Sequence, residues 1–451
     1  MRGALAAVLA LAGAACGQWQ RVGSSDRPAP GTSVAPLFDA RPIYRSMGLL
    51  VAGAPLPFVG AIRYLDGGAP DSTLVLVSLS LANQALRFRR DGAEFLAQYR
   101  VEISVRGDSG VAKALTRDES VRVRSFQETL RADESVIFQQ FFRAVPGGYQ
   151  MSITVRDRGG VALNRVEGVD TVPRFAGPAL SDPLPYYEGE GRGTAAEMPR
   201  LVLNPRATLP YGADSLRVYV EGYGLPEGSP VAVRVLDGAG TALWNDTIAL
   251  ATGGTAGFAR GSVVLAHGGL PVGRLEVEMV ADGAKPQRVP ILVSFSGQYV
   301  ITNFEEMISL LRYFDRQDEV IKLREAGPED RAKLWDEFWR ASDPVPITPE
   351  NEALEDYFRR VQQANLRFME EGAPGWLTDR GEVLITLGEP DEIVDQSSGL
   401  DRGGLRLIRW SYTELRLAVL FEDTSGFGRF RLTPSSRAEY QRVLTRVRRG
   451  Q

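Results

Sequence analysis

This chain of 451 residues contains only one cysteine, Cys16, and only one histidine, His267. One cysteine excludes an internal disulfide, which a chain of this length does not need in order to bury adequate cores. One histidine excludes zinc or iron sites built from several histidines. A Ser-His-Asp triad would have to use His267, which stands before two glycines in a turn-like segment. We therefore predict no metal and no cofactor, and we assign no catalytic residue.

Lysine is scarce as well: Lys113, Lys285, Lys322 and Lys333 are the only lysines among 52 basic residues, and the net charge is −4. That balance argues against nucleic acid as a partner, because nucleic-acid-binding surfaces are strongly basic. Long apolar runs are also missing, since no stretch approaches the ~20 apolar residues that span a bilayer. What is present, 44% hydrophobic and 24% charged residues, is ordinary for folded domains, and the length predicts three or four of them.

The first 16 residues have the order typical of a bacterial lipoprotein signal peptide. Arg2 supplies a positive charge, residues 4–12 are almost all alanine and leucine, and three small residues, 13–15, precede Cys16. In such signals the cysteine thiol takes a lipid and becomes the new N-terminus, which leaves no thiol for catalysis. We predict lipidation at Cys16; an ordinary cleaved signal peptide with an incidental cysteine is the alternative.

Residues 17–41 are predicted to form a flexible tether between this anchor and the folded body. The tract 24–36 is rich in serine, proline, glycine and alanine, a composition that cannot bury enough apolar surface to order itself. Gly17 follows Cys16, and no aspartate stands there; by resemblance to enterobacterial sorting signals, this favours the outer membrane over the inner one. We therefore predict an outer-membrane lipoprotein of the bacterial cell envelope that faces the periplasm and is held to the membrane by its lipid.

Two β-rich regions follow. In residues 42–174, short runs alternate apolar and polar residues with turn signals between them, which is typical of an antiparallel β-sandwich. The expected strands are 49–52, 58–64, 73–81, 99–105, 120–129, 135–142 and 149–155, with Phe126, Phe138, Phe141, Phe142 and Tyr149 as core aromatics. Residues 175–200, rich in proline and glycine, are predicted as a linker. Residues 201–298 carry a second set of runs and an Asp237-Gly238 hairpin signal, and predict a second, Ig-like sandwich.

At about Asn303 the apolar period changes from two to 3.6 residues, which predicts a helical segment over 299–372. A first helix runs from Asn303 to residue 325, a second begins at Pro328, and a third begins at Thr348 and ends at Gly372. Residues 373–451 are predicted as a small α+β domain with a closing helix over 436–449. The apolar run 383–387 fits either a strand or a helix, and periodicity does not decide between them.

The C-terminal region resembles a known family. Gly375-Trp376-Leu377-Thr378-Asp379 matches the Gly-Trp-x-Thr-Asp motif that names the GWxTD-domain proteins, and the match continues at Arg380, Gly381, Gly388, Pro390, Asp391 and Trp410. The resemblance covers roughly residues 300–435, and the β-rich front half is similar to the usual partner of this domain, notably at 126–129 and 146–149. It implies a bacterial lipoprotein with tandem β-domains, and it brings no established molecular activity with it.

The motif has a structural and a catalytic interpretation. In the first, Trp376 packs, Thr378 or Asp379 caps a turn, and Arg380 forms an ion pair, while the glycines and Pro390 shape tight turns. In the second, two carboxylates at a suitable separation hydrolyse glycosides. The candidates for that role are Asp379, Glu382, Glu389, Asp391 and Glu392. We favour the first and predict a lipid-anchored scaffold that binds other envelope proteins; a carboxylate-dependent hydrolase of cell-wall glycan or polysaccharide is the alternative.

Overall fold

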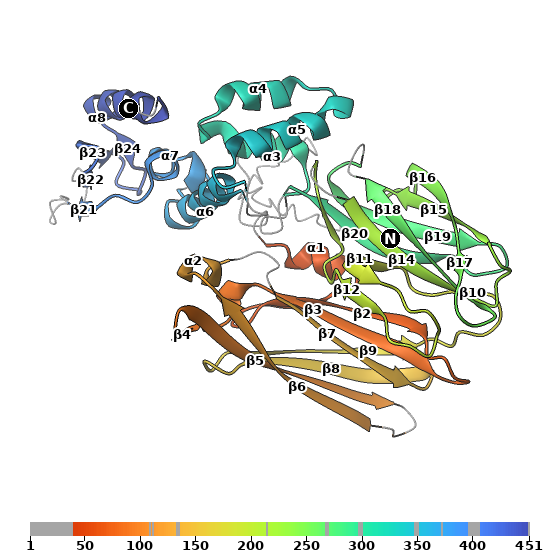
Figure 1. The fold of residues 1–451 in the computed structure, drawn as a ribbon. Helices are drawn as coiled ribbons and strands as arrows, with labels where there is room; N and C mark the ends of the chain where they lie inside the picture. Colours follow the sequence, from red (N-terminus) through yellow and green to blue (C-terminus); the bar gives the residue numbers. More distant parts are fainter. Residues whose placement is uncertain are drawn as a thin grey trace, which may run out of the picture.

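The computed structural model describes residues 39–107, 110, 112–131, 136–212, 215–266, 270–295, 301–346, 351–370, 373–395 and 406–449. Cys16 and the predicted signal peptide lie outside the described residues, as do His267, Thr348 and Gly372. Figure 1 shows two β-rich bodies in contact, with a group of helices and a small sheet beyond them. This arrangement confirms the predicted fold class, a multidomain protein of two antiparallel β-sandwiches, a helical segment and a small α+β domain. The positions of the domain boundaries stay predictions.

The first sandwich, at the bottom of Figure 1, follows the short helix α1 (Arg41–Ser46) and consists of two antiparallel sheets. One sheet has the order β1-β2-β3-β7 and contains β1 (Leu50–Ala52), β2 (Phe58–Asp66), β3 (Thr73–Leu81) and β7 (Val136–Ala144). The other has the order β4-β5-β8-β9, with β6 beside β5, and contains β4 (Arg89–Asp91), β5 (Glu94–Gly107), β6 (Ala112–Val123), β8 (Gly147–Asp157) and β9 (Leu163–Val172). Valines of β3 face Ile103 of β5 and Ile153 of β8 across the core, as alternation predicts.

The strand predicted over 120–129 is wrong in its second half. Strand β6 ends at Val123, and Phe126–Thr129 form a helical turn, α2. The Ser125 hydroxyl accepts a hydrogen bond from the Glu128 N–H, and the Glu128 carboxylate accepts one from the Ser125 N–H. This reciprocal capping box stabilises a helix start and overrides the apolar alternation around it. Phe126, predicted in the core, is consequently 61% exposed.

The second sandwich also consists of two sheets. The first, in the order β12-β11-β14-β18-β17 with β10 beside β14, contains β10 (Ala179–Leu180), β11 (Leu184–Glu190), β12 (Arg200–Leu203), β14 (Ser215–Tyr223), β17 (Ala251–Thr252) and β18 (Phe258–Ala266). The second, in the order β13-β20-β19-β15-β16, contains β13 (Thr208–Pro210), β15 (Pro230–Leu236), β16 (Ala242–Ala249), β19 (Gly273–Ala281) and β20 (Gln287–Ser294). One pair, β13 with β20, is parallel, and the other pairs are antiparallel.

The segment predicted as a linker, 175–200, includes two of these strands. Strands β10 and β11 both pair with β14, and Leu184 is fully buried. β11 lies between β12 and β14, and its one proline, Pro185, stands near the start of the strand, where proline is tolerated. The frequency of turn-forming residues predicts a linker but does not predict strand pairing, so the pairing of β10 and β11 with β14 was not expected.

A small core joins the two sandwiches. Strand β3 is buried along its whole length, since its alternate side chains face two different cores. Leu74 and Leu76 on one face of β3, with Leu65 of β2, contact a set from the second sandwich: Leu184, Tyr186, Leu201, Leu203 and Tyr219. The near-continuous apolar run 73–81 is typical of a strand covered on both sides.

The helical segment packs on the second sandwich and lies above it in Figure 1. It contains α3 (Phe304–Leu310), the 3₁₀ turn η3 (Leu311–Tyr313), α4 (Gln317–Glu325), α5 (Pro328–Ser342) and α6 (Glu352–Arg367). The single helix predicted over 303–325 is therefore two helices, because Phe314 is extended and buries its ring against Phe338 and Tyr357. Asn351 caps α6 by accepting from the Leu354 N–H, and that helix ends at Arg367. None of the described helices is both long and apolar enough to cross a membrane.

The C-terminal part is a four-stranded antiparallel sheet with helices against it. Its strands, in the order β21-β22-β23-β24, are β21 (Glu392–Asp395), β22 (Arg406–Tyr412), β23 (Leu417–Asp423) and β24 (Arg431–Leu432). The 3₁₀ turn η4 (Gly375–Leu377) and α7 (Asp379–Leu387) precede it, and α8 (Pro434–Arg448) follows it. The ambiguous run 383–387 is thus helical, because a capped start at Thr378 places it in the second turn of α7.

Candidate functional site

The GWxTD motif forms the tight connection between η4 and α7. Thr378 is the N-cap of α7: its hydroxyl accepts a hydrogen bond from the Gly381 N–H at 3.1 Å and donates one to the Gly375 carbonyl at 2.7 Å. Its side chain is buried, so these two bonds satisfy a hydroxyl that would otherwise lose its water contacts. The threonine therefore ties the beginning of the helix to the turn that precedes it.

The two glycines of the motif allow backbones to approach closely. A Cβ on Gly375 would lie 2.2 Å from the Ala364 carbonyl oxygen of α6. A Cβ on Gly381 would lie 2.1 Å from the carbonyl oxygen of Gly375. Both distances are below any real contact, so any other residue here would force η4 away from α6 or from α7. The glycines are therefore required for this close packing.

Trp376 is the buried centre of this turn, with 5% of its surface exposed. Its indole meets the Tyr313 ring edge to face, with centroids 6.4 Å apart. Among the described residues its Nε1–H has no hydrogen-bond partner, although buried indole N–H groups usually find one. The ring thus connects the helical segment to the C-terminal domain through packing alone.

Asp379 holds three elements together. Its Oδ2 accepts a hydrogen bond from the Leu432 N–H of β24 at 2.7 Å. The same oxygen forms an ion pair with Arg437 of α8 at 2.5 Å. Its place in the first turn of α7 also suits a negative charge, because N–H groups converge there. The same Arg437 lies 3.8 Å from the Glu382 carboxylate. Burial opposes the charge of Arg437, but the bond to Asp379 leaves the pKa of its guanidinium raised.

Arg380 lies between two aromatic rings and a buried carboxylate. Its guanidinium carbon is 5.0 Å from the Phe368 ring centre and 4.4 Å from that of Phe430. Its Nη2 lies 3.6 Å from Glu370, whose Oε1 also accepts a hydrogen bond from the Phe430 N–H at 3.1 Å. Arg431 binds the other oxygen of Glu370 at 2.8 Å. Burial lowers the pKa of Arg380, and the Glu370 carboxylate acts in the opposite direction.

The later residues of the motif shape the sheet that follows. Gly388 ends α7 with φ of +83°, a value that favours glycine, and its carbonyl accepts a hydrogen bond from the Tyr412 hydroxyl at 3.0 Å. Pro390 is half-buried in the connection to β21, and Asp391 is exposed and accepts from the Thr413 N–H. Trp410 is fully buried between the rings of Phe368 and Phe421.

Each of the five candidate carboxylates has a hydrogen-bond or ion-pair partner among the described residues. Beyond Asp379, Glu382 and Asp391, Glu389 pairs with Arg367, and Glu392 lies 3.3 Å from Arg409. Within the described ranges, no group of three or more His, Cys, Asp or Glu side chains gathers as a metal site would need. The structure thus surrounds the motif with contacts to the protein itself, and Asp379 and Glu382 share Arg437 as a partner.

Sequence reasoning missed three partners of the motif: Glu370, Phe430 and Arg437. Each lies on a different element from the residue it contacts, and Leu432 is 53 residues from Asp379. A signal existed only for Phe430, as one of the aromatics beside the last turn. Nothing local marks Glu370 or Arg437 among many similar charged residues.

These contacts define a small α+β domain organised around a Gly-Trp-x-Thr-Asp turn. The family model of the GWxTD domain matches residues 278–416, and the chain is a GWxTD-domain-containing protein. The matched segment begins inside β19 and ends just before β23. It therefore includes the last strands of the second sandwich, which the resemblance over residues 300–435 had left out, and it stops short of β24 and α8.

None of the curated proteins matches the chain. Among solved structures, a red sea bream transglutaminase is similar at 11% identity with a TM-score of 0.16, over 56% of this chain and 33% of that one. Fibronectin(III)-like modules of CbhA from Clostridium thermocellum are similar at 12% identity and a TM-score of 0.14, over 52% of this chain and 93% of theirs. A domain of a biofilm-associated protein is similar at 8% identity and a TM-score of 0.15, over 56% of this chain and 55% of that one. The chain thus spans about a third of the length of the transglutaminase.

Proposed function

We propose that the protein is a lipid-anchored component of the bacterial cell envelope that binds other envelope proteins as a scaffold. The observation that carries the binding role is the internal use of the motif: Thr378, Asp379 and Arg380 all hold neighbouring elements in place. A domain whose most characteristic side chains fix its own shape is suited to presenting a surface.

The anchor rests on Cys16, which follows an apolar run and three small residues and precedes a flexible tract. The test is metabolic labelling of the full-length chain with a palmitate analogue in a bacterial host, in parallel with Cys16→Ser. The expected result is labelled protein in the membrane fraction for the natural chain and unlabelled protein for the variant. Equal labelling of both chains would refute the anchor.

A candidate contact surface is the α2 turn of the first sandwich. Phe126 and Leu130 are 61% and 58% exposed, and they stand one helical turn apart. Isolated exposed apolar residues are common, but two at this spacing on a capped turn make a small apolar patch. Such a patch is the kind of feature that aromatic-rich protein interfaces use as an anchor.

The binding role is tested by cross-linking in intact cells followed by purification of the full-length chain. We expect a reproducible envelope partner, and we expect Phe126→Glu to reduce its yield. The matched control is Val161→Glu, since Val161 is also exposed and lies in the same sandwich. Absence of any partner above background, with the membrane anchor intact, would contradict the scaffold. An equal loss for both variants would exclude the α2 turn as the contact.

The carboxylate-dependent hydrolase stays an untested alternative, and we do not propose it. Incubation of the purified chain with cell-wall glycan, followed by chromatography of the soluble products, addresses it directly. Product formation that disappears in Asp379→Asn without loss of thermal stability would favour the hydrolase over the scaffold.

A further inference from the structure

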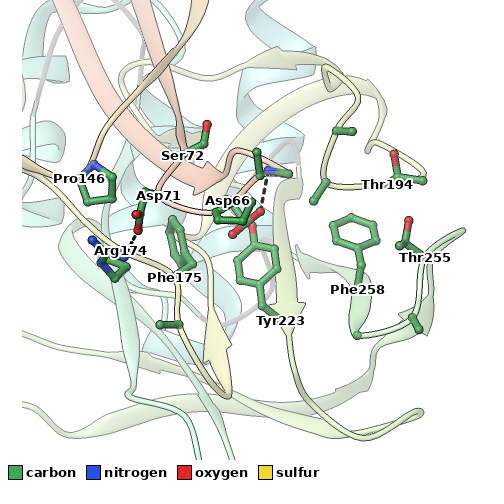
Figure 2. A pocket seen from close by; sticks show the side chains of 18 residues that line it. Asp66, Asp71, Ser72, Pro146, Arg174, Phe175, Thr194, Tyr223, Thr255 and Phe258 are labelled. Atoms are coloured by element: carbon green, nitrogen blue, oxygen red, sulfur yellow. Dashed lines mark hydrogen bonds and ion pairs between the residues drawn. The ribbon is translucent and has the colours of Figure 1, made fainter.

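A cavity of about 540 Å³ lies at the junction of the two sandwiches, far along the chain from the GWxTD motif. Its walls come from the end of β2 and the loop after it, from the segment that connects the sandwiches, and from the loop before β18. Figure 2 shows these segments facing one another around the rings of Phe175, Tyr223 and Phe258. The volume is in the range of small-molecule sites, which occur preferentially between domains.

The wall of this cavity is fixed before any ligand arrives. The Asp66 N–H donates a hydrogen bond to the Tyr223 hydroxyl at 2.9 Å, and the Asp66 carbonyl accepts one from Arg192 at 2.6 Å. Arg192 in turn forms a fully buried ion pair with Glu221. Both backbone groups of Asp66 are thereby attached to the second sandwich, so the position of its side chain is predetermined.

The apolar part of the cavity is a row of three rings. Phe175 meets Tyr223 edge to face with centroids 5.1 Å apart, and Phe258 follows at 6.3 Å from Tyr223. The Tyr223 hydroxyl is occupied by Glu221 and by Asp66, so this tyrosine contributes only its ring. Phe175 is half-buried and offers the most accessible ring surface of the three.

The polar part consists of groups whose hydrogen-bonding capacity is not used up. Asp66 accepts a bond from the Gly68 N–H through Oδ1 at 2.7 Å, while its Oδ2 has no partner among the described residues. The hydroxyls of Ser72 and Thr255 likewise make no hydrogen bond within the described part of the chain. In Figure 2 these groups stand at different points around the rings. An acceptor and two donor–acceptor hydroxyls are thus placed beside apolar ring surface.

The charges restrict the ligand. Among the described residues that line the cavity, the one arginine, Arg174, is paired with Asp71, whereas the carboxylate of Asp66 has no ion-pair partner. An anion would therefore meet the unpaired negative charge of Asp66, while the positive charge of the lining, Arg174, is already paired. A neutral ligand with several hydroxyls and an apolar face would satisfy both halves of the site. We propose that this cavity binds a neutral saccharide, with its C–H face on Phe175 and hydroxyl groups on Asp66.

The test is isothermal titration calorimetry of the full-length chain in a polyoxyethylene detergent, which carries no sugar headgroup that could compete. The probes are maltotetraose, cellotetraose and the tetramer of N-acetylglucosamine, with tetragalacturonate as the anionic comparator and tetramethylammonium as the cationic one. We expect at least one neutral tetrasaccharide to bind with a Kd of about 1 mM or tighter. Binding of none of the three, or binding of the anion or the cation in their place, would overturn the proposal.

Variants locate the site. Asp66→Asn keeps the acceptor for Gly68 and is expected to weaken binding at least about tenfold, since bonds to charged groups are the stronger ones. Its control is Asp237→Asn, because Asp237 also accepts backbone N–H groups in a turn but lies away from the cavity. Phe175→Ala is expected to weaken binding at least about tenfold as well, compared with exposed Phe427→Ala. Unchanged affinity in both Asp66→Asn and Phe175→Ala would refute the assignment.

A blocking variant covers the case in which Phe175→Ala does not fold. Ala256 lines the cavity and is exposed, so Ala256→Trp adds bulk at the entrance without removing a contact. We expect it to abolish binding with an unchanged thermal midpoint, while Ala239→Trp on a distant turn binds normally. Full affinity in a folded Ala256→Trp would refute the site. The saccharide site involves neither the lipid anchor nor the α2 turn. Failure of the binding test would therefore leave the proposed scaffold function intact, and failure of the scaffold tests would leave the saccharide site intact.

Discussion

Replacing Arg192 by methionine is expected to lower the free energy of unfolding at the sandwich junction by about 3–5 kcal/mol, the cost of removing one partner of a buried ion pair. Neither Arg192 nor Glu221 exposes any side-chain surface, and their two parallel bonds measure 2.8 Å and 2.7 Å. Burial lowers the pKa of the Arg192 guanidinium, but the bonds to Glu221 outweigh it and leave that pKa raised. Arg192 also donates to the carbonyls of Asp66 and Ala195, which belong to the two sides of the junction.

The magnitude follows from what the substitution leaves behind. Glu221 would keep only the hydroxyls of Tyr219 and Tyr223, at 2.8 Å and 2.5 Å, as donors to a buried charge. Two part-buried carbonyl oxygens, of Asp66 and Ala195, would also lose a donor, at no more than about 1–3 kcal/mol for each. The double variant Arg192→Met, Glu221→Leu removes both charges. Its loss in free energy of unfolding should therefore be about 2–3 kcal/mol smaller than the summed losses of the two single variants.

The assay is urea unfolding followed by circular dichroism, combined with hydrogen exchange of β2 and β14 to localise the effect, because a multidomain chain need not unfold in one step. The control is Arg100→Met, since Arg100 and Asp118 also form a pair at 2.7 Å but expose 34% and 50% of their side chains. Because solvent screens this exposed pair, Arg100→Met should change the free energy of unfolding far less than Arg192→Met. A change below 1 kcal/mol in Arg192→Met, or simple additivity in the double variant, would refute the reasoning.

Three further predictions concern other buried groups. Burial raises the pKa of Asp182 to about 6, above the ordinary value for an aspartate, so between these two values the native state holds a proton that the unfolded state has lost. The contribution of Asp182 to the free energy of unfolding should fall by roughly 3 kcal/mol as the pH rises from below 4 to above 6, and the difference between the natural chain and Asp182→Asn in urea titrations should change by that amount. Gly381→Ala should lower the free energy of unfolding by at least about 2 kcal/mol in thermal melts, because the clash with the Gly375 carbonyl exceeds the ~1 kcal/mol gained in helix propensity. The control Gly168→Ala should be tolerated, since a Cβ there meets no atom within 4 Å. Thr378→Ala should cost about 1 kcal/mol through loss of the cap, and a change near zero would contradict that role.

Much of the fold follows from local patterns. Alternation located most strands, and the continuous apolar run of β3 is explained by cores on both faces. The errors occur where a short signal opposes the average pattern: the Ser125–Glu128 capping box produced a helical turn inside an expected strand. In the same way, pairing with β14 made strands of a segment that its prolines and glycines describe as a linker.

By itself, the sequence determined the class of fold and the motif that marks the GWxTD domain, because these depend on residues that are close together along the chain. Only the tertiary structure decided what those residues contact. Asp379 meets Leu432 and Arg437, and the cavity beside Phe175 is assembled from loops of both sandwiches. Such contacts join elements far apart in sequence, and packing selects them among many chemically equivalent residues. Periodicity and composition therefore do not predict which of these residues are in contact.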